Sequence, residues 1–142
     1  MAQRMTETEY MSFLLDRART ATLATVRADG RPHAAPVWFD LDGDRLIFAT
    51  GENTVKGRNI RRDPRVTLCI DDESPPFAFA VIEGHAELAA AGPDFLYWAT
   101  RIGGRYMGSE RADEYGQRNA VDGELLVRVI PHKIIAYKNL SD

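Results

Sequence analysis

Residues 21–50 read ATLATVRADGRPHAAPVWFDLDGDRLIFAT, and they carry the clearest signal of the fold class. Its apolar runs and turn signals alternate in the order 21–27, Asp29-Gly30, 32–41, Asp42-Gly43 and 45–50. Asp-Gly pairs between apolar runs favour the tight turns that connect neighbouring antiparallel strands. The stretch therefore predicts a meander of three antiparallel strands joined by two hairpin turns.

The remaining sequence predicts helices and further strands around this meander. Thr6 and Glu9 form a capping box ahead of an apolar run, which predicts a helix over residues 6–19. Further helices are predicted over residues 53–62, 93–101 and 109–119, with a hinge at Gly103-Gly104 between the last two. Further strands are predicted over residues 65–71, 77–88, 124–130 and 133–138, with Pro131 parting the last two.

These runs amount to about seven short strands, and several of them are apolar on both faces, as in residues 21–26. A sheet with two apolar faces has to bury both of them, and closure into a barrel also removes exposed strand edges. We therefore expect a mainly β fold with α-helices: a small barrel of antiparallel strands with peripheral helices. It is expected to form one domain over residues 1–142, with strands across residues 20–138.

Composition excludes several classes of protein. The chain has 142 residues, 44% of them hydrophobic, and a formal net charge of −3, which does not suit a nucleic-acid binder. Cys69 is the single cysteine, so an intramolecular disulfide is excluded, and no Cys/His spacing suits a metal site. With neither a signal peptide nor a membrane span in the sequence, we expect a cytoplasmic protein that does not bind membranes.

The most marked local charge bias lies in residues 54–65, TVKGRNIRRDPR, with five basic residues and one acid. The N-terminus of a helix presents free backbone N–H groups, and Lys56 in the first turn would add a full positive charge. This pattern predicts an anion site that suits a phosphate group. A solvated basic helix face explains the same charges, and the run alone leaves both interpretations open.

Several short motifs, taken in order, resemble the pyridoxamine-phosphate-oxidase-like split-barrel flavoprotein superfamily. They are Thr22-Leu23-Ala24-Thr25-Val26, Asp29-Gly30-Arg31-Pro32, Pro36-Val37-Trp38-Phe39, Phe48-Ala49-Thr50, Lys56-Gly57-Arg58-Asn59-Ile60, Asp63-Pro64-Arg65-Val66 and Ile82-Glu83-Gly84-His85-Ala86-Glu87-Leu88. The resemblance covers residues 20–90, and the later strands match less specifically. It implies an FMN-binding split β-barrel, with the cofactor between the two subunits of a homodimer.

Departures from the family pattern bear on the cofactor. Ala35 and Asp40 stand where the vitamin oxidases carry an arginine and a lysine for the FMN phosphate, and residues 78–79 replace an arginine and a glutamine near the flavin. Vitamin oxidation is therefore not expected. The basic helix and an apolar approach through residues 75–79 resemble the subgroup that uses coenzyme F-420, an 8-hydroxy-5-deazaflavin with a phosphate and an acidic tail.

The resemblance implies roles for nine cofactor-binding residues. They are Val37, Trp38, Ala49, Thr50 and Gly51 at the barrel mouth, Lys56 and Asn59 with Thr50 at the phosphate end, and Phe77 and Phe79 covering the ring from a second subunit. The implied activity is hydride transfer from reduced coenzyme F-420 to an unsaturated planar organic substrate, such as a quinone, a nitroaromatic or a tetrapyrrole. The alternatives are an FMN-dependent oxidoreductase, or a non-catalytic carrier of a flavin, a deazaflavin or haem.

No catalytic side chain is assigned from the sequence. The three histidines lie on separate predicted elements and are interpreted as structural, and Cys69 is interpreted as core packing. The serines lack the pattern of a nucleophile elbow, which argues against a hydrolase. Tyr106, next to Gly103-Gly104, is the best spare proton donor.

Overall fold

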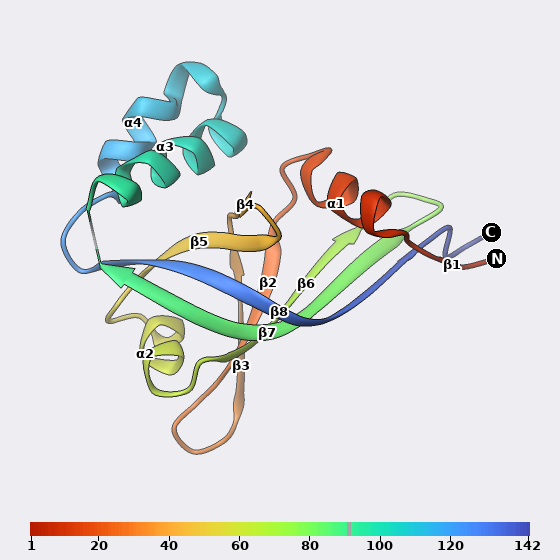
Figure 1. Ribbon diagram of the computed structural model, residues 1–142, viewed down its shortest axis with the longest axis horizontal. Coiled ribbons are helices and arrows are strands. Elements are labelled where there is room, and N and C mark those ends of the chain that lie inside the picture. The colour runs from red at the N-terminus through yellow and green to blue at the C-terminus, as the bar shows by residue number, and fades with distance from the viewer. Residues whose placement is uncertain (91) are drawn as a thin grey trace.

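The computed structural model describes residues 1–90 and 92–142. Its strands are β1 (Gln3–Arg4), β2 (Ala21–Val26), β3 (Pro32–Val37), β4 (Asp40–Asp42), β5 (Arg45–Gly51), β6 (Arg65–Asp72), β7 (Ala78–Ala90) and β8 (Glu124–Lys138). Its helices are α1 (Glu7–Leu15), α2 (Val55–Arg62), α3 (Pro93–Met107), the short 3-10 helix η1 (Ser109–Arg111) and α4 (Ala112–Asn119) (Figure 1). No helix in the described residues is long and apolar enough to cross a membrane.

The strands form one antiparallel sheet, in the order β3-β2-β6-β7-β8-β5-β4, with β1 added beside the end of β8. The two predicted hairpins are confirmed, because β2 pairs with β3 and β4 pairs with β5, but they do not form one three-stranded meander, since β3 and β4 lie at opposite ends of the sheet. Full closure is not observed: β3 and β4 are the two ends of this order, and no ladder joins them in the part of the chain that the structure describes. The sheet is therefore a strongly curved, open barrel.

Two apolar clusters form the core. The larger one lies inside the curved sheet beneath α1 and includes Leu14, Leu23, Phe48, Leu68 and Ile82, none of which exposes more than a trace of surface. The smaller one joins α3 to the outer side of β5 and β8, and consists of Ile47, Phe95, Trp98, Ala99 and Leu126. Residues 47 and 126 thus give β5 and β8 an apolar outer face. This explains why apolar and polar residues do not simply alternate along these two strands.

Pro131 does not end a strand, contrary to the prediction of two C-terminal strands. β8 continues through it, and the register with β7 shifts by one residue between Glu83 and Gly84, so that Gly84 stands opposite Pro131. A methyl group on Gly84 would lie 2.2 Å from the carbonyl oxygen of Ile130. The proline lacks an N–H for the ladder, and the bulge places it where none is needed.

Other elements also differ from the predictions. α1 ends at Leu15 rather than near residue 19, because the Arg19 guanidinium folds back to donate a 2.7 Å hydrogen bond to the Phe13 carbonyl. The predicted strand over residues 32–41 breaks into β3 and β4 around Trp38 and Phe39. β1 was not predicted, because a strand of two residues is too short to show an alternation of apolar and polar residues.

Gly103 and Gly104 lie inside α3 and do not form the predicted hinge. A methyl group on Gly103 would lie 2.5 Å from Cβ of Tyr115, and one on Gly116 would lie 2.0 Å from Oγ1 of Thr100. The glycines therefore let α3 and α4 approach closely (Figure 1). The helix ends instead at Gly108, whose φ of +98° suits glycine.

We expect Gly103→Ala to destabilise the protein by about 1–3 kcal/mol, since the overpacking against Tyr115 outweighs the roughly 1 kcal/mol that alanine gains in helix propensity. Urea denaturation would measure the change. Gly104→Ala is the matched control, because its nearest contact would be a methyl group at 3.0 Å, and its effect should be smaller. A stabilised Gly103→Ala variant would contradict the packing role.

Candidate functional site

The first turn of α2 is seated against the end of β5. Thr54 caps the helix: its Oγ1 accepts a 3.0 Å hydrogen bond from the Gly57 N–H and donates one of 2.7 Å to the Gly51 carbonyl. A side chain on Gly57 would lie 2.1 Å from that same carbonyl oxygen, so only glycine allows this approach. The N–H groups of Val55 and Lys56 have no carbonyl partner within the helix and remain available for an anion.

Asn59 anchors the other end of α2. The residue is 4% exposed, and its side-chain amide donates a 3.0 Å hydrogen bond to Oγ1 of Thr25 on β2. Its carbonyl oxygen accepts a 3.1 Å hydrogen bond from Arg62, which also donates to the Val26 carbonyl. Both polar groups of Asn59 are therefore engaged within the protein. In this structure its role is to position the helix, and its predicted phosphate contact remains a prediction.

A pocket of about 360 Å³ lies beside the first turn of α2. Four of the predicted residues line it, namely Val37, Trp38, Ala49 and Lys56. Trp38 forms one aromatic wall: it stacks on Tyr106 with ring centroids 4.9 Å apart, and Tyr115 lies 6.1 Å away at an angle of 53°. We call this the aromatic pocket, and it combines a flat apolar surface with a cation.

Thr50 and Gly51 lie next to the aromatic pocket rather than among its lining residues. Thr50 is 4% exposed, and its Oγ1 lies 3.2 Å from Oγ1 of Thr54. Gly51 gives Glu124 room, since a methyl group on it would lie 3.2 Å from a carboxylate oxygen of Glu124. These two residues therefore shape the seat of α2.

Glu124 was not singled out in the sequence, although it lines the aromatic pocket with Lys56. Burial raises the pKa of the Glu124 carboxyl, and the charge of Lys56 acts in the opposite direction. Glu124 is the first residue of β8 and pairs with Gly51 in the β5–β8 ladder. Nothing in its local sequence marks it, because only the β5–β8 pairing brings it to Lys56.

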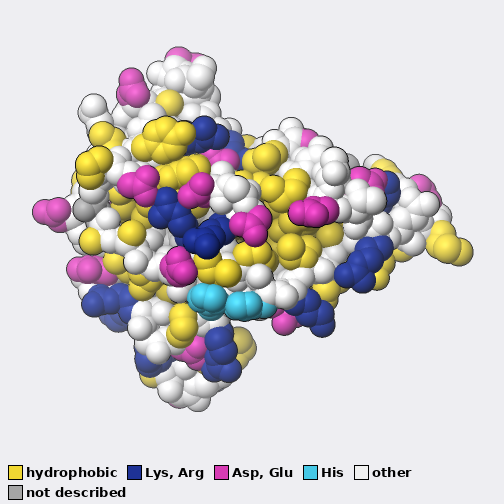
Figure 2. All heavy atoms as spheres, in the orientation of Figure 1, with side chains coloured by type: hydrophobic (Ala, Val, Ile, Leu, Met, Phe, Trp, Pro, Cys, Tyr) yellow, Lys and Arg dark blue, Asp and Glu magenta, His cyan; other side chains and the backbone are white. Residues whose placement is uncertain are grey.

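A second pocket, the arginine groove, lies on another side of α2. It has a volume of about 800 Å³ and is lined by Arg27, Arg31, Arg58 and Arg62, with Asp29, Val55 and Asn59. Basic side chains gather over α2 and the β2–β3 turn in Figure 2. Val55 lines the groove and the adjacent Lys56 lines the aromatic pocket, so the two pockets lie on different sides of the first turn of α2.

Phe77 and Phe79 lie far from Lys56 in the same chain. Phe79 pairs with Tyr137 at one end of the β7–β8 ladder, whereas Ala90 pairs with Leu125 at the other end. Eleven residues of extended strand span about 36 Å. Phe77 is 37% exposed and has a φ of +61°, a rare conformation for an aromatic residue. One subunit therefore does not bring these rings to its own aromatic pocket.

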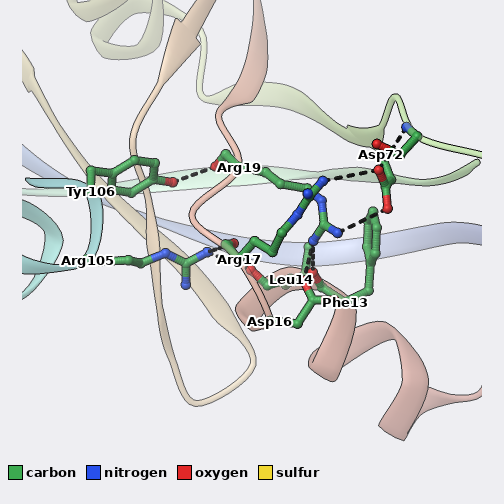
Figure 3. A network of polar contacts seen from close by, with 9 residues as sticks. Phe13, Leu14, Asp16, Arg17, Arg19, Asp72, Arg105 and Tyr106 are labelled. Carbon is green, nitrogen blue, oxygen red and sulfur yellow. Dashed lines mark hydrogen bonds and ion pairs between the residues drawn. The ribbon is translucent and has the colours of Figure 1, made fainter. Parts of the chain in front are cut away.

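Tyr106 is not free to donate a proton, contrary to its interpretation as a spare donor. Its hydroxyl donates a 2.6 Å hydrogen bond to the Arg19 carbonyl and accepts one of 3.1 Å from the Phe39 N–H. Arg105 on the same helix donates to the carbonyls of Leu14 and Arg17 (Figure 3). This network fixes the end of α1 and the back of Trp38.

The remaining candidates are structural. Asp40 is buried and paired with Arg101 at 3.2 Å and Arg105 at 3.8 Å, which ties β4 to α3. His85 and His132 share a 2.6 Å hydrogen bond across the β7–β8 bulge, and adjacent histidine side chains are visible in Figure 2. Cys69 is half-buried on the outer face of β6 rather than in the core. In residues 1–90 and 92–142, no three potential metal ligands cluster.

Comparison with known proteins identifies the family. A family model described as pyridoxamine 5'-phosphate oxidase matches residues 7–137, which is most of the chain and includes both pockets. This chain belongs to the pyridoxamine 5'-phosphate oxidase family. The split-barrel fold expected from the resemblance is thereby confirmed, with a sheet that stays open. The chain is an oxidoreductase of this family, whose members bind flavin-type cofactors.

Three relatives are informative. The chain is 32% identical over 123 residues to a 5a,11a-dehydrotetracycline/5a,11a-dehydrooxytetracycline reductase of Streptomyces rimosus, which covers 81% of this chain and 71% of that protein. A conserved hypothetical protein from Mycobacterium tuberculosis has a similar structure, with a TM-score of 0.82, 26% identity and coverage of 96% and 87%. A structure of an F-420 reductase superposes with a TM-score of 0.68, 27% identity and coverage of 87% and 94%.

We expect the pH dependence of anion binding to report on Glu124. Because burial raises its pKa, Glu124 takes up a proton at higher pH than an ordinary glutamate, so sulfate binding beside Lys56 should strengthen as pH falls from about 7 to about 5. Glu124→Gln should bind sulfate more tightly at pH 7 and lose most of this dependence. Titration calorimetry would measure both.

Glu52→Gln is the matched control for this experiment. Glu52 lies near the same helix but pairs with Arg61 at 3.8 Å and does not line the aromatic pocket. The control should keep the pH dependence of the unmodified protein. An identical pH dependence in Glu124→Gln would show that Glu124 does not act on the anion site.

Proposed function

We propose that this chain transfers a hydride from reduced coenzyme F-420, an 8-hydroxy-5-deazaflavin, to an unsaturated planar organic substrate. A quinone, a nitroaromatic or a tetrapyrrole is such a substrate. The observation that carries the proposal is the placement of two unlike pockets on different sides of the first turn of α2, one aromatic and one lined by arginines. Coenzyme F-420 combines a planar ring, a phosphate and an acidic tail. These three parts match the aromatic wall, the anion site at Lys56 and the arginine groove.

The aromatic pocket suits the ring and the phosphate. Val37, Ala49 and the stacked Trp38 offer a flat apolar wall, and the free N–H groups of the α2 first turn with Lys56 offer an anion site. When bound, the deazaflavin supplies the hydride itself. The chain's own task is to orient the ring and to exclude water from it.

The arginine groove supports coenzyme F-420 over FMN. FMN carries one phosphate and no acidic tail, so four guanidinium groups around about 800 Å³ exceed what it requires. Arg31 is paired with Asp29 at 2.8 Å and Arg62 binds α2 and β2, whereas Arg27 and Arg58 form no ion pair within the described residues. Arg27 and Arg58 are therefore the groups we assign to the tail.

The relatives support a reductase of this kind. The 5a,11a-dehydro compounds named for the Streptomyces enzyme contain a carbon–carbon double bond in a polycyclic ring system, which is an acceptor of the class proposed here. The F-420 reductase supports the choice of coenzyme. The competing functions are an FMN-dependent oxidoreductase and a non-catalytic carrier of a flavin, a deazaflavin or haem.

We also propose a homodimer in which Phe77 and Phe79 of one subunit cover the ring held by the other. Phe77 is exposed in an unusual backbone conformation, and its carbonyl accepts a hydrogen bond from the Leu140 N–H that holds the loop in place. An aromatic ring held outward in this way gains most from a covering surface. The partner's aromatic pocket would be that surface.

A cofactor titration followed by turnover tests the function. We expect saturable binding of coenzyme F-420 in the micromolar range, weak binding of FMN and haem, and loss of the reduced coenzyme's signal when a quinone or a nitroaromatic is added. Tight binding without turnover over the substrate classes would favour the carrier. Preferential binding of FMN would favour the FMN-dependent enzyme.

We expect Lys56→Ala to lower the affinity for coenzyme F-420 by about ten- to one-hundred-fold, since it removes a charge-assisted contact of about 1.5–3 kcal/mol. Folding stability should hardly change, because Lys56 forms no ion pair within the described residues. Fluorescence titration at low ionic strength would measure the affinity. Equal affinities would mean that α2 is only a solvated basic face.

Arg58→Ala should weaken coenzyme F-420 binding in a salt-dependent way, because screening acts on exposed charges, and should leave FMN binding nearly unchanged. Arg61→Ala is the matched control: it lies on the same helix, pairs with Glu52, and does not line the arginine groove. Both variants are compared by titration at two salt concentrations. Equal losses in the two variants would contradict a specific tail site.

Sedimentation should give a dimer at micromolar concentration, and Phe77→Ser should weaken both dimerisation and coenzyme binding. The two losses are linked because the ring of Phe77 would contact both the partner subunit and the coenzyme. A monomer with full coenzyme affinity would refute the shared site.

A further inference from the structure

A reduction by hydride also needs a proton, and the aromatic pocket is the place where this proton has to be supplied. The hydride brings one hydrogen and two electrons to one end of a double bond, so that the other end, or an oxygen conjugated with it, gains negative charge. A proton on that atom completes the neutral product. A side chain that donates it therefore has to line the pocket.

Among the described residues that line the aromatic pocket, Glu124 is the one carboxylic acid. The other ionisable groups of this lining are an amine, a phenol and a guanidinium, which belong to Lys56, Tyr115 and Arg118. As side-chain types, these three hold their protons to far higher pH than a carboxyl group does. The hydroxyl of Tyr106 is already bonded to two backbone groups. Glu124 is thus the best proton donor that the pocket offers.

The carboxyl group of Glu124 is half-buried and has room for a bound molecule. Its two oxygens have no hydrogen-bond or ion-pair partner in the described residues, and neither belongs to the enclosed side-chain atoms that lack a partner. One of them lies over Gly51, where a methyl group would approach it to 3.2 Å. The carboxyl is therefore reachable from the aromatic pocket that it lines.

Two opposing effects act on the proton of Glu124. Burial raises the pKa of the carboxyl, and the positive charge of Lys56 opposes this rise. Arg118 and the phenol of Tyr115 are the ionisable groups that α4 brings to the same pocket, and β5 brings the uncharged Gly51. An anion bound beside Lys56 would cancel the opposing charge. Glu124 therefore holds its proton most firmly when the anion site is filled.

We infer, on the basis of the proposed hydride transfer, that Glu124 is a catalytic residue whose carboxyl group donates a proton to the acceptor of the hydride. The coenzyme supplies the hydride when it is bound. The π bond of the acceptor breaks, a C–H bond forms with the hydride, and an O–H or C–H bond forms with the proton as the O–H bond of Glu124 breaks. Solvent returns a proton to the carboxylate once the product has left.

Two planar acceptors separate proton donation from hydride transfer. Methylindenone, a neutral enone, needs a hydride and a proton, whereas the N-methylacridinium cation becomes a neutral product with a hydride alone. In single turnovers with reduced coenzyme F-420 at saturating acceptor, Glu124→Gln should slow methylindenone reduction by about one-hundred-fold or more. It should change N-methylacridinium reduction by no more than about twofold, because no proton is required.

Glu52→Gln is the matched control for the kinetics. Glu52 pairs with Arg61 and does not line the aromatic pocket, so this variant should reduce both acceptors at the rate of the unmodified protein. Both variants should melt at the temperature of the unmodified protein, since each replaces a carboxylate by an amide of the same shape. A loss of rate is thereby separated from a loss of folded protein.

The carboxyl group can also be followed without coenzyme, by NMR of protein with isotopically labelled glutamate carboxyl carbons. The signal of Glu124 is the one that disappears in Glu124→Gln. We expect this carboxyl to release its proton at higher pH than an ordinary glutamate, and sulfate beside Lys56 should move the release to still higher pH. In Lys56→Gln the release should already lie at the higher pH, and sulfate should have no effect.

Several results would overturn the role of Glu124. Equal slowing of both acceptors in Glu124→Gln would make it a binding or packing residue, and unchanged rates with both would mean that water supplies the proton. A carboxyl that titrates like an ordinary glutamate, with and without sulfate, would also contradict the inference. No turnover of either acceptor by the unmodified protein would instead refute the hydride transfer itself, and the role of Glu124 with it.

Discussion

The pairing of β7 with β8 fixes the distance between the aromatic pocket and the Phe77–Phe79 segment. The two strands are 13 and 15 residues long and pair from Phe79–Tyr137 to Ala90–Leu125, with one bulge at Gly84. A ladder of this length is stiff, and the bulge gives it the bend that wraps the sheet around the core. The aromatic pocket lies at one end of the ladder, and Phe79 lies at the other.

The basic residues fall into two groups: those whose side chains are bonded within the protein, and those that remain free to bind a ligand. Arg19 and Arg105 donate to carbonyls at the end of α1 (Figure 3). Arg62 and Asn59 fasten α2 to β2. Guanidinium groups with several fixed acceptors lose their freedom on folding and have little capacity left for a ligand. Lys56, Arg27 and Arg58 form no ion pair in the described residues, so a sequence run of uniform charge contains both kinds of residue.

The sequence predicted the parts of the fold that depend on local chemistry. Gly30 and Gly43 follow aspartates at the two hairpin turns and have φ values of +88° and +62°. The Thr6 capping box forms as expected, with Glu9 donating its N–H to the Thr6 hydroxyl. Turns and caps are decided within four residues, so their residues suffice to predict them.

Predictions failed where a distant partner decides the outcome. Gly103 is glycine because of Tyr115 on α4, and Pro131 stays in a strand because Gly84 stands opposite it. Glu124 reaches Lys56 only through the pairing of β5 with β8. The sequence contains these residues but does not show their neighbours in space, so it predicted a hinge at Gly103 and a strand break at Pro131.

When a cofactor performs the bond chemistry, the protein mainly has to supply a binding surface of the right shape rather than a set of catalytic side chains. The proposed cofactor face follows this rule: Val37, Ala49, Gly51 and Gly57 contribute by being small or apolar, and Lys56 supplies the charge. Small residues have many structural uses, so no single one of them is diagnostic, and the set acquires meaning only when β3, β5 and α2 converge. Substrate selection in such a site depends on the walls beside the ring, here Trp38 and Tyr115. Because Tyr106 stacks on Trp38 and is itself bonded to the Arg19 carbonyl, the network at the end of α1 also fixes the shape that a substrate would meet.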